Sequence, residues 1–380
     1  MNVLYVSHSG GLDGAPKSLL EFVEVARNKG ITPIVVLPNK GVFQNELHKK
    51  NIETLVISFK TCVYSDRLKA RDWYRYIRTN IAAVMSLTKV VRERQIDLIH
   101  SNSLAVDIGA MASIITGVPH IWHFREFLEE DFGFHLNTPI ITRYLVKKSK
   151  GIIAISHCIK RKYWKKYGLE PYLFYDGINA VLYSNTVLEH DADNNMLLLA
   201  GTISEGKGQW DAIRAVEILK KKGISVQLNI VGNGNPVYVN GLRRYVRQQG
   251  MAGCIQFKTY VPDLNEMRKK SVICLTCSRM EALGRVTAEA MMSGTIVIGA
   301  STGGTRELIG AKEQRGYLYP PGNPQELAEK IEYVLRNPAE VEQKEKRAQE
   351  FIVKLTDIEK YADKVINIYQ KVVNRSDENE

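Results

Sequence analysis

The sequence predicts an α/β protein made of two doubly wound, Rossmann-like domains, and three observations support this fold class. Short apolar runs alternate with amphipathic stretches of helical length, this alternation occurs in both halves of the chain, and a polar segment separates the halves. Strands that alternate with helices of this length form parallel sheets that are covered on both faces. Two successive sets therefore predict two such domains.

The first set of apolar runs predicts the sheet of an N-terminal domain. Amphipathic stretches between the runs, such as 17–28 and 77–94, are expected to form the covering helices. The predicted strands are Val3–Val6, Ile34–Leu37, Glu53–Ile57, Asp97–His100, His120–His123 and Gly151–Ile155.

The second set repeats this plan in a C-terminal domain. The polar segment 189–195 is the best linker candidate, so we expect domains over residues 1–188 and 189–356, followed by a helix at about 357–373. The predicted strands are Met196–Ala200, Val226–Val231, Ile255–Lys258, Val272–Thr276, Ile296–Ala300 and Gly316–Leu318.

The bulk composition is typical of a globular protein in a reducing compartment. The chain has 380 residues, which is long for one core, and five scattered cysteines, which do not suggest a disulfide framework. It opens with the strand-like segment 2–6 without a preceding basic region, which predicts no signal peptide. No apolar run approaches the roughly 20 residues of a membrane span. We therefore expect a cytoplasmic protein.

Positive charge gathers in one part of this basic chain, which has a formal net charge of +11. No acidic residue occurs between Asp131 and Glu170, and aromatic residues are interleaved with lysines and arginines there. Such a face could contact nucleic acid or an anionic membrane, or it could be a solvated helix face. Because no recognised nucleic-acid-binding module is present, nucleic acid is not an expected partner.

The most informative segment, 278–291, follows an apolar run and opens a helical pattern. Glu281 lies in the loop and Glu289 about one turn into the helix, with Gly284 between them. Ligands of open parallel sheets bind outside the carboxyl ends of the strands, where the N–H groups of a helix start suit phosphate. Two carboxylates beside such a turn predict a ligand with phosphate and hydroxyl groups, such as a nucleotide-sugar.

Glycine turns follow several other predicted strands. The first resembles the dinucleotide fingerprint but lacks its full G-x-G-x-x-G order. In the C-terminal domain, Lys207 stands between glycines at a helix start, where its ammonium group suits a diphosphate. The candidate donor-binding residues of these turns are Gly11, Gly14, Gly201, Thr202, Gly232 and Gly234.

A histidine ends one strand of the N-terminal domain. His123 alone would more often be structural than functional, but Arg125 and Glu126 stand in the same turn. This neighbourhood favours a functional role for the histidine. Arg125 and Glu126 are candidates for acceptor or donor contacts.

Together these motifs resemble the retaining glycosyltransferases of family 4, from Gly10 to about Pro321. The E-x7-E pattern of Glu281 and Glu289 is the signature of that family, and the glycine turns arrive in its order and approximate spacing. The resemblance implies the GT-B fold, in which the parallel sheets of two Rossmann-like domains face across a cleft. It also implies that the helix at about 357–373 packs back on the N-terminal domain, where the acceptor binds.

The resemblance implies a role for each candidate residue. His123 would contact the donor sugar near its reacting carbon, Lys207 would neutralise the diphosphate, and Glu281 would accept hydrogen bonds from the sugar hydroxyls. Glu289 would bind the ribose, while Gly11 and Gly284 would lie against the donor. Thr202 stands where the family usually has an arginine, so diphosphate neutralisation would rest on Lys207 and backbone N–H groups, with Arg285 or Arg125 as further candidates.

The expected reaction uses neither a metal nor another cofactor, and its co-substrate is a nucleotide-diphosphate sugar. The chain has no D-x-D cluster for a divalent ion, and Cys274 and Cys277 form a C-x-x-C inside an apparent buried strand. Lysine and helix-start donors would stabilise the leaving group electrostatically. A retaining glycosidase uses a carboxylate nucleophile, but the resemblance places Glu281 on the far side of the sugar. We therefore expect front-face attack, with the departing phosphate oxygen accepting the proton of the acceptor.

The acceptor is expected to be a glycan or a lipid-linked sugar of cell-surface polysaccharide assembly. The basic and aromatic residues at 143–167 and 67–78 suit a peripheral position on the inner, anionic face of a membrane. Two alternatives stay open: another GT-B enzyme, such as a nucleotide-sugar epimerase, and a non-catalytic subunit that binds nucleotide-sugars. A nicotinamide oxidoreductase is disfavoured because no acidic residue stands at the end of the second predicted strand, Ile34–Leu37.

Overall fold

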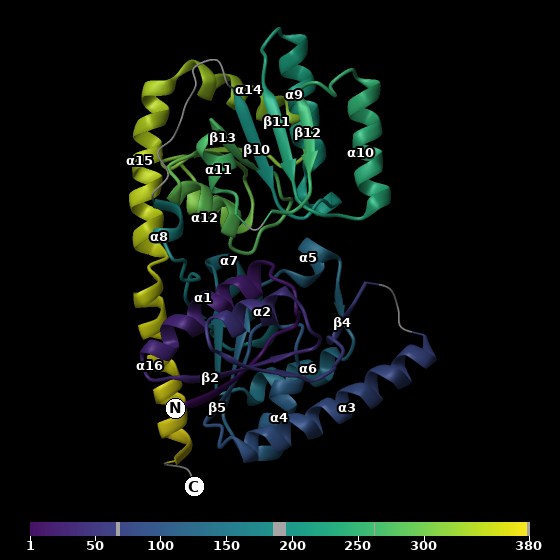
Figure 1. Ribbon diagram of the computed structural model, residues 1–380, viewed down its shortest axis with the longest axis vertical. Coiled ribbons are helices and arrows are strands. Elements are labelled where there is room, and N and C mark those ends of the chain that lie inside the picture. Colours follow the sequence, from purple (N-terminus) through teal and green to yellow (C-terminus); the bar gives the residue numbers. More distant parts are fainter. Residues whose placement is uncertain (66–68, 185–194, 262, 378–380) are drawn as a thin grey trace. The chain divides into compact units, whose positions relative to one another are not determined.

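The computed structural model describes residues 1–65, 69–184, 195–261 and 263–377, and its two compact units have the predicted doubly wound architecture (Figure 1). The N-terminal unit comprises Met1–Ile178 and Thr356–Glu380, and the C-terminal unit comprises Asn179–Leu355. The predicted linker falls almost entirely on residues 185–194, which lie outside the described part. The C-terminal unit begins at Asn179 rather than at residue 189, because a short helix, α8 (Val181–Ser184), belongs to it.

The N-terminal unit contains a seven-stranded sheet in the order β3-β2-β1-β5-β6-β8-β9, and all neighbouring strands are parallel. This order changes direction between β1 and β5, which creates a topological switch point. The strands are β1 (Asn2–Val6), β2 (Thr32–Leu37), β3 (Glu53–Val56), β5 (Leu98–Ser101), β6 (His120–Phe124), β8 (Gly151–Ala154) and β9 (Tyr172–Leu173).

Helices cover this sheet on both faces. On one face, α1 and α16 pack together over side chains of β1, and on the other face α3 and α4 do so. The helix predicted from residue 77 begins seven residues earlier, since Tyr76 in the added turns is buried. The helices are α1 (Gly14–Asn28), α2 (Val42–Lys49), α3 (Ala70–Glu93), α4 (Ile108–Thr116), α5 (Leu128–Phe132), α6 (Pro139–Lys148), α7 (His157–Tyr167) and α16 (Ile358–Asp377). A separate antiparallel pair, β4 (Val63–Tyr64) and β7 (His135–Leu136), was not predicted.

The C-terminal unit contains a six-stranded parallel sheet in the order β12-β11-β10-β13-β14-β15, with its switch point between β10 and β13. Each predicted strand of this half has a counterpart. The strands are β10 (Met196–Ala200), β11 (Gln227–Val231), β12 (Ile255–Lys258), β13 (Ile273–Thr276), β14 (Ile296–Ala300) and β15 (Tyr317–Tyr319).

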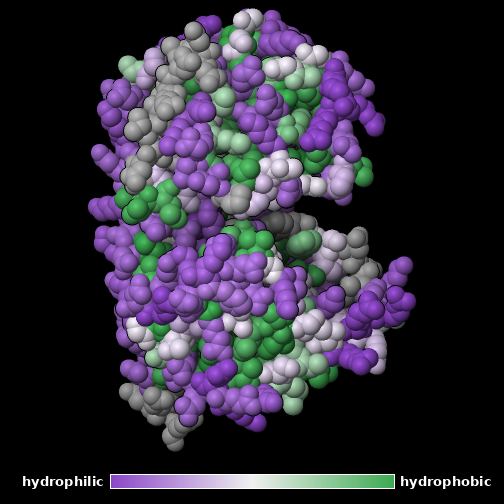
Figure 2. Space-filling model, viewed as in Figure 1, coloured by the Kyte–Doolittle hydropathy of each residue, from purple (hydrophilic) through white to green (hydrophobic). Residues whose placement is uncertain are grey.

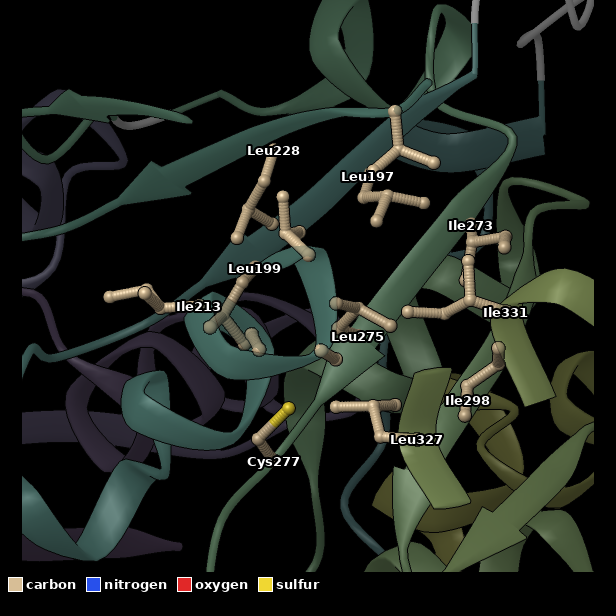
Figure 3. Close-up of a cluster of buried hydrophobic side chains, with 14 of the residues drawn as sticks. Leu197, Leu199, Ile213, Leu228, Ile273, Leu275, Cys277, Ile298, Leu327 and Ile331 are labelled. Carbon is tan, nitrogen blue, oxygen red and sulfur yellow. The ribbon is translucent and has the colours of Figure 1, made fainter. Parts of the chain in front are cut away.

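The core of this unit lies between the sheet and its helices (Figure 3). Leu197, Leu228 and Leu275 project from neighbouring strands toward Ile213 of α9 and Leu327 of α14, and all of them are buried. Besides α8, the helices are the 3₁₀ turn η1 (Glu205–Lys207), α9 (Gln209–Lys221), α10 (Pro236–Gln248), α11 (Asn265–Lys269), α12 (Arg285–Met292), α13 (Gly303–Ile309), α14 (Pro324–Arg336) and α15 (Pro338–Leu355).

Candidate active site

The loops after β10 and β13 meet at the switch point of the C-terminal sheet. The backbone N–H of Arg279 donates to the carbonyl of Gly206 at 2.8 Å. Gly208 has a φ of +67°, and a Cβ there would lie 2.0 Å from the carbonyl oxygen of Cys277. Only glycine allows this approach, so the two loops pack backbone against backbone. The predicted donor residues Lys207 and Glu281 stand on these two loops.

Lys207 and Glu281 contact each other across the switch point. The Lys207 Nζ lies 3.3 Å from Glu281 Oε2, and the two side chains are 19% and 20% exposed. A pair that is partly solvated can exchange its mutual contact for contacts with a ligand at modest cost. The structure thus brings together a cation and a carboxylate that were assigned to the diphosphate and the donor sugar.

Glu289 has a different environment from Glu281. It is buried, and its carboxylate accepts hydrogen bonds from Arg268 NH2 at 2.5 Å and from Arg285 Nε at 2.9 Å. Arg268, which is also buried, has its guanidinium 5.5 Å from the ring centre of Tyr183. Arg285, a candidate for the diphosphate, thus has a carboxylate partner on its own helix. Its proposed contact with the diphosphate stays a prediction.

The glycine turns of this unit hold neighbouring loops against each other. A Cβ at Gly232 would lie 1.9 Å from the carbonyl oxygen of Gly201, and a Cβ at Gly234 would lie 2.1 Å from that of Ile203. Thr202, on the same loop as Gly201, is exposed, and its carbonyl accepts from Gln209 Nε2 at 2.9 Å. These glycines therefore have a packing role in the structure, and their contact with a donor stays a prediction.

A third glycine turn supports the loop that carries Glu281. Gly303 has a φ of +44°, and a Cβ there would lie 2.1 Å from the carbonyl oxygen of Glu281. The N–H of Gly304 donates to the same oxygen at 2.7 Å. Gly284, with a φ of +84°, caps the start of α12. The backbone around Glu281 is thus fixed from the side of α13.

The first loop of the N-terminal unit lies at the switch point between β1 and β5. The N–H of Gly11 donates to Ser9 Oγ at 2.9 Å, and Gly14 opens α1 with free space where a Cβ would stand. The positions in this region that sterically require glycine are instead Gly10 and Gly41. A Cβ at Gly41 would lie 2.2 Å from the carbonyl oxygen of Gly10. Both predicted residues are exposed, and a ligand could approach them.

His123 is fully buried at the end of β6. Its Nδ1 lies 3.2 Å from Arg125 NH2, and because a guanidinium group only donates, Nδ1 must accept. The proton of the neutral ring is then on Nε2, which lies 4.0 Å from an Asp176 oxygen. Burial lowers the pKa of His123 well below its ordinary value, and the charge of Arg125 lowers it further. The histidine is a neutral donor, and its contact with a donor sugar stays a prediction.

Arg125 forms a buried ion pair that sequence reasoning missed. Its NH1 lies 2.6 Å from both carboxylate oxygens of Asp176, and its Nε donates to Asn102 at 2.8 Å. Asp176 precedes the point at which the chain leaves the N-terminal unit, where the N–H of Ile178 donates to the carbonyl of Thr356 at 2.8 Å. Arg125 was predicted to contact the acceptor or the donor, and Asp176 was not predicted as its partner.

Glu126 has partners within its own unit. Its carboxylate accepts from the N–H of Arg125 at 3.2 Å and from the hydroxyl of Ser103, and Tyr163 Oη donates to its carbonyl at 2.8 Å. These bonds join the loop after β6 to the loop after β5 and to α7. Glu126 therefore stabilises the loops around His123, and its contact with a substrate stays a prediction.

Among the described residues, no group of three or more histidine, cysteine or acidic side chains is arranged to hold a metal ion. Cys274 and Cys277 are buried, and burial raises the pKa of both thiols to about 12. Thiols that stay protonated are poor metal ligands and poor nucleophiles.

Two Rossmann-like units, each with a parallel sheet, form the architecture of the GT-B fold, which the following comparisons support. The family model for group 1 glycosyl transferases matches residues 185–370, and that for glycosyltransferase family 4 matches residues 12–181. These matches indicate a GT-B glycosyltransferase of the family 4 type.

Curated relatives are similar to this chain over part of their length. The 2-deoxystreptamine glucosyltransferase of Streptomyces kanamyceticus is 27% identical over 177 residues, which are 46% of this chain and 45% of that protein. The trehalose synthase of Pyrococcus horikoshii is 25% identical over 186 residues, 47% of this chain and 44% of that protein. The chain thus matches less than half of the length of these relatives.

Solved structures share the fold over the whole chain. The Anabaena Alr3699/HepE structure in complex with UDP and glucose has a TM-score of 0.83 and 22% identity, and the match covers 98% of this chain and 100% of that one. Sucrose-phosphate synthase from Thermosynechococcus elongatus has a TM-score of 0.78, 16% identity and coverage of 99% and 100%. The lipopolysaccharide outer core galactosyltransferase WaaB has a TM-score of 0.72, 15% identity and coverage of 98% and 99%. At these identities the likeness shows the fold alone.

Proposed function

We propose that this protein is a retaining, metal-independent glycosyltransferase. It would transfer a sugar from a nucleotide-diphosphate sugar to a hydroxyl group of a lipid-linked or polysaccharide acceptor in cell-surface glycan synthesis, acting from the cytoplasmic side. The observation that carries this proposal is the Lys207–Glu281 pair at the switch point of the C-terminal sheet, 3.3 Å apart and partly exposed. Such a pair offers one cation and one carboxylate to a ligand that carries both phosphate and hydroxyl groups.

Each member of the pair would exchange its partner when the donor binds. The Lys207 ammonium would turn to the diphosphate, whose negative charge grows as the sugar departs, and this electrostatic stabilisation needs no metal. The Glu281 carboxylate would accept hydrogen bonds from hydroxyl groups of the sugar. In front-face transfer the departing phosphate oxygen takes the acceptor proton, and neither carboxylate acts as a nucleophile.

Glu289 would bind the ribose while its arginine partners stay in place. A carboxylate has about four acceptor sites, more than the two hydrogen bonds from Arg268 and Arg285 require. The two guanidinium groups also hold the carboxylate in one orientation. The proposed ribose contact is thus compatible with the buried ion-pair network.

The solved relatives favour particular donors and acceptors for the first experiments. HepE has been solved with UDP, with UDP and glucose and with UDP-glucose, so UDP-sugars are the first donors to test. WaaB is described as a lipopolysaccharide outer core galactosyltransferase, which supports a surface glycan as acceptor.

A calorimetric binding screen over UDP-, GDP-, ADP- and dTDP-sugars, followed by product analysis by NMR, tests the proposal. We expect one nucleotide class to bind and the product to keep the anomeric configuration of the donor. Glu281→Gln should lower kcat/KM about tenfold, because glutamine keeps an acceptor oxygen but loses the charge that strengthens the hydrogen bond from the sugar. The exposed Glu350→Gln serves as the matched control.

Several results would contradict parts of this proposal. Product formation without an acceptor would indicate an epimerase, and donor binding without turnover for any acceptor would indicate a binding subunit. An inverted product would exclude the retaining mechanism. Loss of turnover in EDTA would exclude metal independence, and near-normal transfer by Glu281→Gln would remove the donor-sugar contact.

A further inference from the structure

Helix α3 of the N-terminal unit carries apolar side chains on two faces. One face is buried in the core and includes Leu87 and Val91. A second row stays exposed at spacings of three, four and four residues, and at about 100° per residue it lies within an arc of roughly 80°. This row, called the α3 stripe, consists of Tyr74 (67% exposed), Ile77 (50%), Ile81 (61%) and Met85 (61%).

A row of cations borders the α3 stripe on the side away from the core. With a rotation of about 100° per residue, these side chains cover an arc that begins at the angle of Tyr74 and ends about 100° farther around the helix. All are exposed, and only Lys89 has an acidic partner among the described residues, Glu93 at 3.6 Å. The region of Figure 2 that corresponds to α3 in Figure 1 accordingly shows hydrophobic patches beside strongly hydrophilic ones. The cations are Arg71, Arg75, Arg78, Lys89 and Arg92.

Two further helices of this unit, α4 and α6, also expose apolar side chains. α4 packs against both α3 and α6 and exposes Ile114 and Ile115. On α6, Ile140 is 85% exposed, and Ile141 and Tyr144 are exposed beside it. The cations of α6 are Arg143, Lys147 and Lys148, none of which has a carboxylate partner in the described part of the chain.

The basic stretch predicted over residues 143–167 thus divides into two parts. On α7, Lys160 pairs with Glu170, Lys162 with Glu130 and Lys166 with Glu129, so much of the charge of that helix is neutralised within the unit. The unpaired cations of α3 and α6 accompany exposed apolar side chains instead. An outward apolar row beside unpaired cations is the pattern of a helix that lies in a membrane interface.

We propose that α3, together with α6, docks the N-terminal unit on the surface of an anionic bilayer. The α3 stripe would enter the boundary between head groups and acyl chains, and the bordering cations would contact anionic head groups. Each such cation contributes a factor of about five to the partition coefficient. Among the described residues, no helix is long and apolar enough to cross a membrane, so this contact would be peripheral.

The charge of this surface argues against a second copy of the chain as its occupant. Two copies of α3 facing each other would bring rows of unpaired arginines together, and like charges repel. An anionic lipid surface satisfies both the cations and the apolar row. The proposal rests on the proposed function in one respect: a lipid-linked acceptor would be presented at the same surface.

Co-sedimentation with phosphatidylcholine vesicles, with and without phosphatidylglycerol, tests the docking surface. We expect binding only to the anionic vesicles, weakened at high salt because screening acts on exposed charges. The double variant Ile77→Glu/Ile81→Glu should lower the partition coefficient at least tenfold. Val237→Glu, which changes an exposed apolar residue of the C-terminal unit (82% exposed), should leave it unchanged.

Three outcomes would overturn the proposal: no binding to anionic vesicles at low salt, equal binding by the double variant, or a dimer that the double variant converts to a monomer. The last outcome would make the α3 stripe an interface between copies. Donor binding by calorimetry is measured on the same samples. Loss of vesicle binding with intact donor binding separates this surface from the proposed function, whose failure would appear as absent donor binding with vesicle binding retained.

Discussion

Replacing Glu289 by glutamine should destabilise the C-terminal unit much more than replacing Glu281. Glu289 is the carboxylate partner of Arg268, whose side chain is 2% exposed and cannot turn to solvent. Removing one member of a buried ion pair costs about 3–5 kcal/mol, because the other charge is left uncompensated. Arg285 is 11% exposed and can turn outward, so we expect the lower end of that range.

The effect is large enough to measure by calorimetry. For a domain of this size, 1 kcal/mol shifts Tm by about 2–4 °C, so Glu289→Gln should lower the Tm of the C-terminal unit by roughly 6–12 °C. The matched control is Glu281→Gln, which breaks a partly solvated pair and should cost less than about 1 kcal/mol. The double variant Glu289→Met/Arg268→Met should recover much of the loss, because apolar residues can replace a buried pair without penalty.

A Tm of Glu289→Gln within about 2–4 °C of that of the natural protein would refute this reasoning. It would mean that Arg268 is solvated or paired in another way. Donor binding by the folded variant answers a separate question. Unchanged affinity would limit Glu289 to a structural role and remove its proposed ribose contact.

Two further predictions concern buried histidines and a constrained glycine. Burial keeps three histidines of the N-terminal unit neutral, with pKa values well below the ordinary one for two and about 3 for the third: His100, His123 and His120. As pH falls through about 6.5 the unfolded chain gains protons that the buried rings do not, so the free energy of unfolding of the N-terminal unit should fall. Between pH 7.5 and 5.5 the three histidines lower it by about 4 kcal/mol, and Asp107, whose pKa burial raises to about 6, offsets about 1 kcal/mol of this loss. In the C-terminal unit burial raises the pKa of Glu345 to about 7, which acts in the opposite direction, so unfolding of the two units is followed separately. Urea unfolding at both pH values measures this, and equal stability would contradict it. Gly303→Ala should displace the Glu281 loop, cost at least about 2 kcal/mol and weaken donor binding about tenfold, whereas Gly241→Ala, where a Cβ meets nothing within 4 Å, should do neither in the same assays.

The fold could be predicted from the sequence because buried parallel strands leave a strong signal. A strand covered on both faces is a continuous apolar run, and β10 was predicted with its observed bounds. The two-residue strands β4 and β7 have no such run, and their pairing depends on contacts across the chain. Short elements of this kind therefore cannot be predicted from the periodicity of apolar residues.

The partners of the site residues could not be predicted for a related reason. Glu289 and Arg268 are 21 residues apart, and Arg125 and Asp176 are 51 residues apart. No repeat or spacing connects members of such pairs, since the sheet topology brings them together. The sequence therefore indicated which residues have suitable chemistry for a donor site. It did not indicate which of them already pair with another residue of the chain.

The glycines show why a correct motif can carry two explanations. A ligand that approaches the backbone and a second loop that approaches the backbone both exclude a Cβ, so they select the same residue. At Gly232 and Gly303 the structure supplies the second explanation, with carbonyl oxygens about 2 Å from the position of a Cβ. Loops fixed in this way present Lys207 and Glu281 from a rigid backbone, which lowers the entropy lost on binding a donor. The packing role of these glycines is thus itself a reason to expect a ligand at this edge of the sheet.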